Sequence, residues 1–155
     1  TVGVALEFGV FSGRTLRLIS EYYPEKSYGF DSFGGLPEDW REGFPRGAFC
    51  VDKVPHVEGA KIIVGLFQDT LIKFIGDLKE PISFIHLDAD LYSPTLYALT
   101  SLAPYLKKGD IIFFDEFVVP THEFKAFLDF TQSYYIKLEL IAAANNYYFT
   151  AFKVV

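Results

Sequence analysis

The chain has 155 residues, of which 50% are hydrophobic, and a formal net charge of −6. This composition excludes a disordered chain, and a negative charge without any basic cluster argues against nucleic-acid binding. No apolar run is long enough to span a membrane and no signal peptide is visible, so we expect no membrane association. Cys50 is the only cysteine, which rules out an internal disulfide and predicts a cytoplasmic location. The length fits one domain, residues 1–155.

The stretch from Val4 to Thr15, VALEFGVFSGRT, has the pattern of a buried strand, a glycine turn and a helix start. Gly9 and Gly13 allow positive φ angles and a close approach of backbone to a ligand, and a helix N-terminus offers free N–H groups. The second and third glycines of a GxGxxG motif are absent, so the loop alone is a weak signal of a nucleotide site. Glu7, at the end of the strand, is placed to accept hydrogen bonds from a cationic amino group or from the loop; a purely structural acid is the alternative.

The rest of the chain alternates strand-like and helix-like segments, which is typical of a parallel sheet with helices on both faces. Pro24 ends the first helix, and Ser93 with Pro94 predicts the start of the third. We expect Pro104 to kink or shorten the last turn of that third helix. We expect strands at 27–31, 60–65, 81–88 and 110–115, helices at 14–23, 66–75, 93–106 and 123–132, and a final hairpin of 134–142 and 147–155 turning at Asn145-Asn146.

The segment from Ser32 to His56 has no clear periodicity and is rich in Gly and Pro, with Trp40, Phe44 and Phe49 among its charges. A connection of this length is usually functional or disordered. Disordered linkers seldom carry so many aromatic residues, so we interpret it as a lid.

Acidic residues stand where the predicted parallel strands end. In an open α/β sheet the carboxyl ends of the strands line one crevice, where ligands bind. Acids also follow strands as turn formers and helix caps, which is the alternative for each one taken singly. The acids concerned are Glu7, Asp31, Asp88 and Asp115, with Asp69 just past the third strand.

Five ordered motifs resemble the macrocin O-methyltransferase family, a branch of the class I S-adenosylmethionine-dependent methyltransferases. They are LEFGVFSGRTLRLI, YGFDSFGGLPEDW, GLFQDTL, FIHLDADLYSPT and FFDEF. The resemblance implies a doubly wound, seven-stranded sheet of order 3-2-1-4-5-7-6 with the seventh strand antiparallel, which agrees with the predicted hairpin. It also implies methyl transfer from S-adenosylmethionine to a hydroxyl, typically on a sugar of a natural product, with help from a divalent metal.

Carried over to this sequence, the resemblance places Glu7 and the glycine loop at the methionine part of the cofactor and Asp31 at the ribose hydroxyls, which a carboxylate can accept as a pair. Gln68 and Asp69 are placed to meet the adenine edge, although a Gln-Asp-Thr helix cap is the alternative. The full set of cofactor residues expected is Glu7, Gly9, Val10, Phe11, Ser12, Gly13, Asp31, Ser32, Phe33, Gln68, Asp69 and Asp88.

Three acids, Asp88, Asp115 and Glu116, suggest a metal site. Hard carboxylate oxygens without cysteine or clustered histidine favour Mg²⁺ over Zn²⁺, and a resemblance to catechol-type O-methyltransferases supports the same placement. Acids that only cap turns are the alternative, and Asp90 is a substitute ligand. We expect Asp88 or a metal-bound water to accept the proton; His86 is a second candidate base, or else a satisfied core histidine.

The function expected is therefore O-methylation of a small-molecule hydroxyl, with S-adenosylmethionine and Mg²⁺ as cofactors; the oligomeric state, including a homo-oligomer, is open. Two alternatives belong to other classes. A cofactor-binding module without catalysis would have no need of the acid set at Asp88, Asp115 and Glu116. An oxidoreductase using a nicotinamide cofactor would suit Asp31 but predicts the GxGxxG loop that this chain lacks.

Overall fold

A computed structural model describes residues 3–155 of the chain. Strands and helices alternate along most of its length, as the sequence predicts. In chain order the elements are β1 (Val4–Phe8), α1 (Arg14–Tyr22), β2 (Ser27–Asp31), β3 (Ala60–Val64), α2 (Phe67–Asp77), β4 (Ile82–Leu87), α3 (Tyr92–Leu102), the 3₁₀ turn η1 (Ala103–Tyr105), β5 (Ile111–Phe114), α4 (Glu123–Tyr134), β6 (Leu138–Ala144) and β7 (Phe149–Val154).

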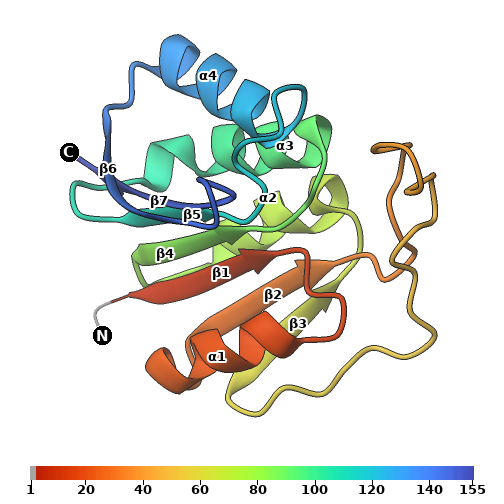
Figure 1. Cartoon of the computed structure of the whole chain (residues 1–155). Helices are drawn as coiled ribbons and strands as arrows, with labels where there is room; N and C mark the ends of the chain where they lie inside the picture. Colours follow the sequence, from red (N-terminus) through yellow and green to blue (C-terminus); the bar gives the residue numbers. More distant parts are fainter. Residues whose placement is uncertain (1–2) are drawn as a thin grey trace.

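The strands form one seven-stranded sheet of order β3-β2-β1-β4-β5-β7-β6. Strands β1 to β5 pair in parallel, and β7 runs antiparallel to both β5 and β6. Helices α2, α3 and α4 cover one face and α1 lies on the other (Figure 1). The predicted α/β architecture, with its strand order and antiparallel seventh strand, is confirmed.

The central strand β1 is buried along its whole length, because neighbouring strands flank it and helices cover it. Its apolar side chains join those of β2 and β4 in the main core; the rings of Phe8 and Phe30, for example, stack at 5.0 Å. Burial of each such side chain stabilises the fold by about 1.5–3 kcal/mol. Parallel pairing brings the carboxyl ends of β1, β2, β4 and β5 to the same edge of the sheet.

In helix α3 one local prediction is wrong and another is confirmed. Helix α3 begins at Tyr92 after an extended Leu91, and Ser93 does not cap it. The Ser93 hydroxyl instead donates to Glu38 in the long segment between β2 and β3. The helix ends at Leu102 and continues as the 3₁₀ turn that contains Pro104, so the proline shortens it as predicted.

The C-terminal hairpin also differs in its bounds. Tyr134 ends helix α4 rather than beginning a strand, and Tyr135 follows in the left-handed region at φ 55°. The connection between β6 and β7 is four residues long, and Asn145 and Asn146 both have positive φ. Asparagine tolerates this conformation better than most residues, which is why the pair marks the turn correctly. Among the helices formed by residues 3–155, none has the length and hydropathy needed to cross a membrane.

Candidate active site

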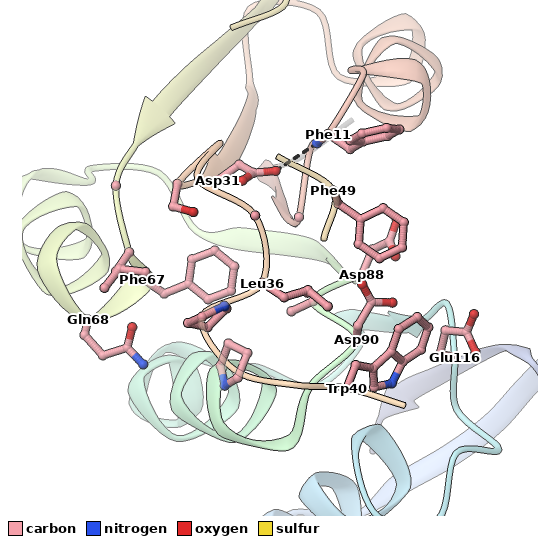
Figure 2. A pocket seen from close by; sticks show the side chains of 18 residues that line it. Phe11, Asp31, Leu36, Trp40, Phe49, Phe67, Gln68, Asp88, Asp90 and Glu116 are labelled. Atoms are coloured by element: carbon pink, nitrogen blue, oxygen red, sulfur yellow. Dashed lines mark hydrogen bonds between the residues drawn. The ribbon is translucent and has the colours of Figure 1, made fainter. Parts of the chain in front are cut away.

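A cavity of about 300 Å³ lies at the carboxyl ends of the strands. Figure 2 shows Phe67 and Gln68 at one end of it and Trp40, Asp90 and Glu116 at the other. The walls come from the loops after five successive strands, so residues far apart in the sequence meet here. This placement follows the general rule for ligand sites in open α/β sheets.

The glycine loop after β1 is shaped by contacts that exclude a side chain. Gly9 has a φ of 97°, and a Cβ added there would lie 1.8 Å from the carbonyl oxygen of Asp88. The loop after β1 therefore packs directly on the loop after β4. Gly13, at φ 75°, precedes α1 in the left-handed region, without a side-chain cap on the helix. A glycine is required at both places because L side chains rarely adopt these angles.

The carboxylate of Asp31 joins two of the loops that surround the cavity. Its Oδ2 accepts the backbone N–H groups of Val10 and Phe11, both at 2.8 Å, and its Oδ1 accepts that of Phe33 at 2.7 Å. A carboxylate oxygen can accept two donors, so Oδ1 keeps a free acceptor position. Asp31 thus fixes the glycine loop and still offers an oxygen to a ligand in the cavity that it lines.

Half of the predicted cofactor residues line the cavity. Val10 and Phe33 instead pack with Leu16 and Val57 in a small hydrophobic cluster, and Asp69 lies in the first turn of α2, outside the lining. The lining includes Gly9, Phe11, Asp31, Ser32, Gln68 and Asp88; it does not include Glu7, Val10, Ser12, Gly13, Phe33 or Asp69.

Glu7 contacts a histidine and not the glycine loop. Its Oε1 lies 3.0 Å from Nδ1 of His86, its partner on β4, and both side chains are almost fully buried. Nε2 of His86 lies 3.6 Å from Oδ1 of Asp115. Burial raises the pKa of Glu7. Burial opposes the charged imidazolium, but the carboxylates of Asp115 and Glu7 beside it raise the pKa of His86 to about 10. A histidine that keeps its proton at neutral pH is a poor general base.

The predicted metal residues separate into two neighbouring groups. Asp88 and Asp115 offer oxygens that lie, with a nitrogen of His86, within 4.8 Å of one another. Glu116 lies at the edge of the cavity, with its Oε1 3.8 Å from Nη2 of Arg41. Its Oε2 is buried without a hydrogen-bond partner among residues 3–155. The metal assignment stays a prediction.

The acids at this end of the cavity share one electrostatic environment. Burial raises the pKa of Asp88 to about 8, with a further increase from Asp115, and raises that of Asp90 to about 7, with a further increase from Glu116. Glu123, the first residue of α4, is fully buried and accepts the backbone N–H of Glu116 at 3.0 Å. Burial holds its pKa well above the ordinary range. The folded chain therefore retains protons here near neutral pH.

The segment 32–56 supplies the aromatic wall of the cavity. Trp40 and Phe44 close a short turn through backbone hydrogen bonds, and their rings lie 5.2 Å apart next to Phe49. Trp40 is only 7% exposed. The aromatic residues therefore do lie over the crevice, as the lid interpretation requires; opening and closing of this segment remain predictions.

Comparisons with known proteins agree with this architecture. A family model described as a methyltransferase domain matches residues 6–117, and the chain therefore belongs to this methyltransferase family. A search of curated protein sequences found no match.

Solved structures show the same Rossmann-like methyltransferase fold. CalS11, the calicheamicin methyltransferase, superposes with a TM-score of 0.81 at 23% identity, covering 99% of this chain and 72% of that one. The O-methyltransferase NovP gives 0.73 at 20% identity, covering 97% and 71%. Fibrillarin from Aeropyrum pernix, in complex with S-adenosylmethionine, gives 0.56 at 13% identity, covering 99% and 66%.

Sequence reasoning missed two charged residues of the site. Arg41 directly follows Trp40 and stands three positions before Phe44, and a cation between two aromatic residues is a signal that the sequence contains. Glu123 gave no such signal, because an acid in the first turn of a helix is ordinary. Only the packing of α4 against the loop after β5 brings its carboxylate to the site.

Proposed function

We propose that this protein is an S-adenosylmethionine-dependent O-methyltransferase that acts on a hydroxyl of a small molecule, a sugar or another hydroxylated natural product. The observation that carries the proposal is one cavity joining Asp31 and the glycine loop to a cluster of acids, in a chain of a methyltransferase family. Two proteins of the same fold support the choice of acceptor: CalS11 is described as a TDP-rhamnose 3′-O-methyltransferase, and NovP as an O-methyltransferase.

The cofactor would lie along the cavity with its adenosine part between Asp31 and Gln68. The free acceptor position on Asp31 suits a ribose hydroxyl, and Phe67 and Gln68 offer an apolar face and an amide to the adenine. The methionine part would then follow the glycine loop at Gly9. This direction leaves the acidic end, around Asp88, for the methyl group and its acceptor.

The donor atoms at the acidic end suit a divalent cation. The available groups are hard carboxylate oxygens, and the buried Oε2 of Glu116 lacks a partner among the described residues. Asp88, Asp115 and Glu116 would hold the cation, and Mg²⁺ is the ion that prefers such ligands. When bound, the cation would lower the pKa of an acceptor hydroxyl and stabilise its negative charge.

The chain's own residues would position the reactants and take the proton. Transfer breaks the bond between sulfur and methyl and forms the bond between methyl and oxygen, which requires both reactants in line at near contact. Asp88 would accept the hydroxyl proton in its ionised form; its pKa of about 8 leaves a minority of that form at neutral pH, far more than His86 with a pKa of about 10 has of its neutral form. The reaction neutralises the sulfonium charge, so exclusion of water by Trp40 and Phe49 favours it.

Calorimetric titration with S-adenosylmethionine and S-adenosylhomocysteine tests this proposal, with NADH as the control ligand. We expect both sulfur compounds to bind and NADH not to bind. Release of S-adenosylhomocysteine in a panel of sugars, phenols and other alcohols, with Mg²⁺ or with a chelator, would then identify the acceptor class. Binding of NADH alone would contradict the methyltransferase assignment, and cofactor binding with no turnover of any acceptor would favour a non-catalytic module.

A further inference from the structure

Arg41 brings a positive charge from the segment 32–56 to the acidic end of the cavity. Its guanidinium carbon lies 3.8 Å from the ring centre of Trp40 and 5.2 Å from that of Phe44. Its Nη2 lies 3.8 Å from Oε1 of Glu116. The guanidinium thus contacts an aromatic wall of the cavity and, at the same time, one of the acids that we assign to the cation site.

Of the residues that line the cavity, two have a buried side-chain atom without a hydrogen-bond partner among residues 3–155. These atoms are Nε1 of Trp40, a donor, and Oε2 of Glu116, an acceptor. A buried polar atom without a hydrogen bond lowers stability, so these atoms indicate an arrangement that is completed only when the cavity is occupied.

We propose that Arg41 occupies the position of a counter-charge to Glu116 until a divalent cation binds, and that cation binding displaces it and thereby changes the surroundings of Trp40. The inference rests on the proposed Mg²⁺ site. A guanidinium and a divalent cation repel each other at short range, so one carboxylate cannot hold both closely. Because Arg41 stacks on Trp40, its displacement would alter the wall that an acceptor meets. Arg41 is therefore a positioning residue.

The geometry of the pair suits an exchange of partners. The separation of 3.8 Å is long for an ion pair, and the Arg41 side chain is 43% exposed. An ion pair whose cationic partner is this exposed to solvent contributes little to stability. The guanidinium can therefore leave Glu116 without loss of the fold, and water can replace its contacts.

Trp40 is the single tryptophan of the chain, so its fluorescence reports directly on this place. The experiment compares Mg²⁺ titrations of the wild type and Arg41→Gln, at constant ionic strength, by calorimetry and by tryptophan emission. We expect Arg41→Gln to bind Mg²⁺ at least about threefold more tightly, because a competing charge is gone. We also expect it to lose most of the emission change that Mg²⁺ causes in the wild type.

Two further variants make the result specific. Arg46→Gln removes the same charge from the same segment at an exposed residue outside the cavity lining, and it should match the wild type in both measurements. Arg41→Lys keeps the charge but lacks the planar group that stacks on Trp40, so it should keep wild-type Mg²⁺ affinity and show a smaller emission change.

Equal or weaker Mg²⁺ binding by Arg41→Gln, relative to Arg46→Gln, would overturn the inference while leaving the proposed cation site intact. A wild type that binds S-adenosylhomocysteine but no Mg²⁺ would instead overturn the cation site, and the role of Arg41 with it. The two failures are distinguished by the wild-type titration alone.

Discussion

Replacement of Asp31 by alanine tests how one carboxylate supports both the loop and the cofactor. In the folded chain it accepts backbone N–H groups from Val10, Phe11 and Phe33 at 2.7–2.8 Å. A hydrogen bond to a charged group contributes about 1.5–3 kcal/mol. The N–H of Phe11 is exposed and can donate to water in the variant. The part-buried bonds from Val10 and Phe33 are lost, so we expect Asp31→Ala to lower the free energy of unfolding by about 3–6 kcal/mol, measured in urea.

The same substitution should weaken cofactor binding more than tenfold. Oδ1 of Asp31 accepts one N–H and keeps a position for a ribose hydroxyl. Loss of one charged hydrogen bond at about 1.5–3 kcal/mol corresponds to roughly a tenfold to hundredfold change in affinity. Calorimetric titration with S-adenosylhomocysteine measures this effect directly, below the temperature at which the variant begins to unfold.

Asp69→Ala is the matched control, because Asp69 is an acid of the same predicted set that lies outside the cavity lining. It should keep the wild-type affinity within about twofold, while losing a few tenths of a kcal/mol of stability at the N-terminus of α2. Asp31→Ala with unchanged affinity for S-adenosylhomocysteine would refute the ribose assignment, and a large effect of Asp69→Ala would move the adenine toward that residue.

Three other predictions concern the acids and the aromatic segment. Asp115→Asn should abolish the rise in melting temperature that Mg²⁺ causes, while S-adenosylhomocysteine still binds within about twofold of the wild type; an undiminished rise would exclude Asp115 as a ligand. Asp88 has a pKa of about 8 when folded, above its unfolded value, so its contribution to cation-free stability falls between about pH 4 and pH 8. Asp88→Asn should therefore be more stable than the wild type at pH 8 in urea, with a difference that shrinks toward pH 5; a constant difference would contradict this. Hydrogen exchange in residues 32–56 should slow when cofactor and acceptor bind; equal rates in both states would make the segment a static loop.

Much of the fold follows from local patterns. Each parallel strand is a short apolar run bounded by turn residues, and Asn145-Asn146 marks the C-terminal hairpin, so the elements are found within a few residues. The errors fall where tertiary contacts outweigh local preference. Ser93 has the chemistry of a helix cap, but its hydroxyl contacts Glu38 in the long loop, and the helix begins before it. Tyr134 suits a strand, yet packs against Phe130 as the last residue of α4.

The site is predicted less completely than the fold. The acids at strand ends do converge, because the topology of a parallel sheet places them on one edge. The sequence does not show which of these side chains contact one another. The buried pair of Glu7 and His86 joins residues 79 positions apart, and it could not be separated in advance from a contact of Glu7 with the glycine loop. The link of Glu123 to Glu116 depends on how α4 is packed.

The electrostatics of the acidic end explain why these features belong together. Asp88, Asp90 and Glu116 all have raised pKa values, chiefly because burial opposes their charge. Near neutral pH the acidic end balances this burial with bound protons and with Arg41 beside Glu116. A divalent cation would offset the cost of burying these carboxylates more strongly than Arg41 does, because it would lie closer to them. Its binding would release protons and the guanidinium together. Cation affinity, pH and the position of the aromatic wall are then parts of one equilibrium, so a change in any one should be measurable in the other two.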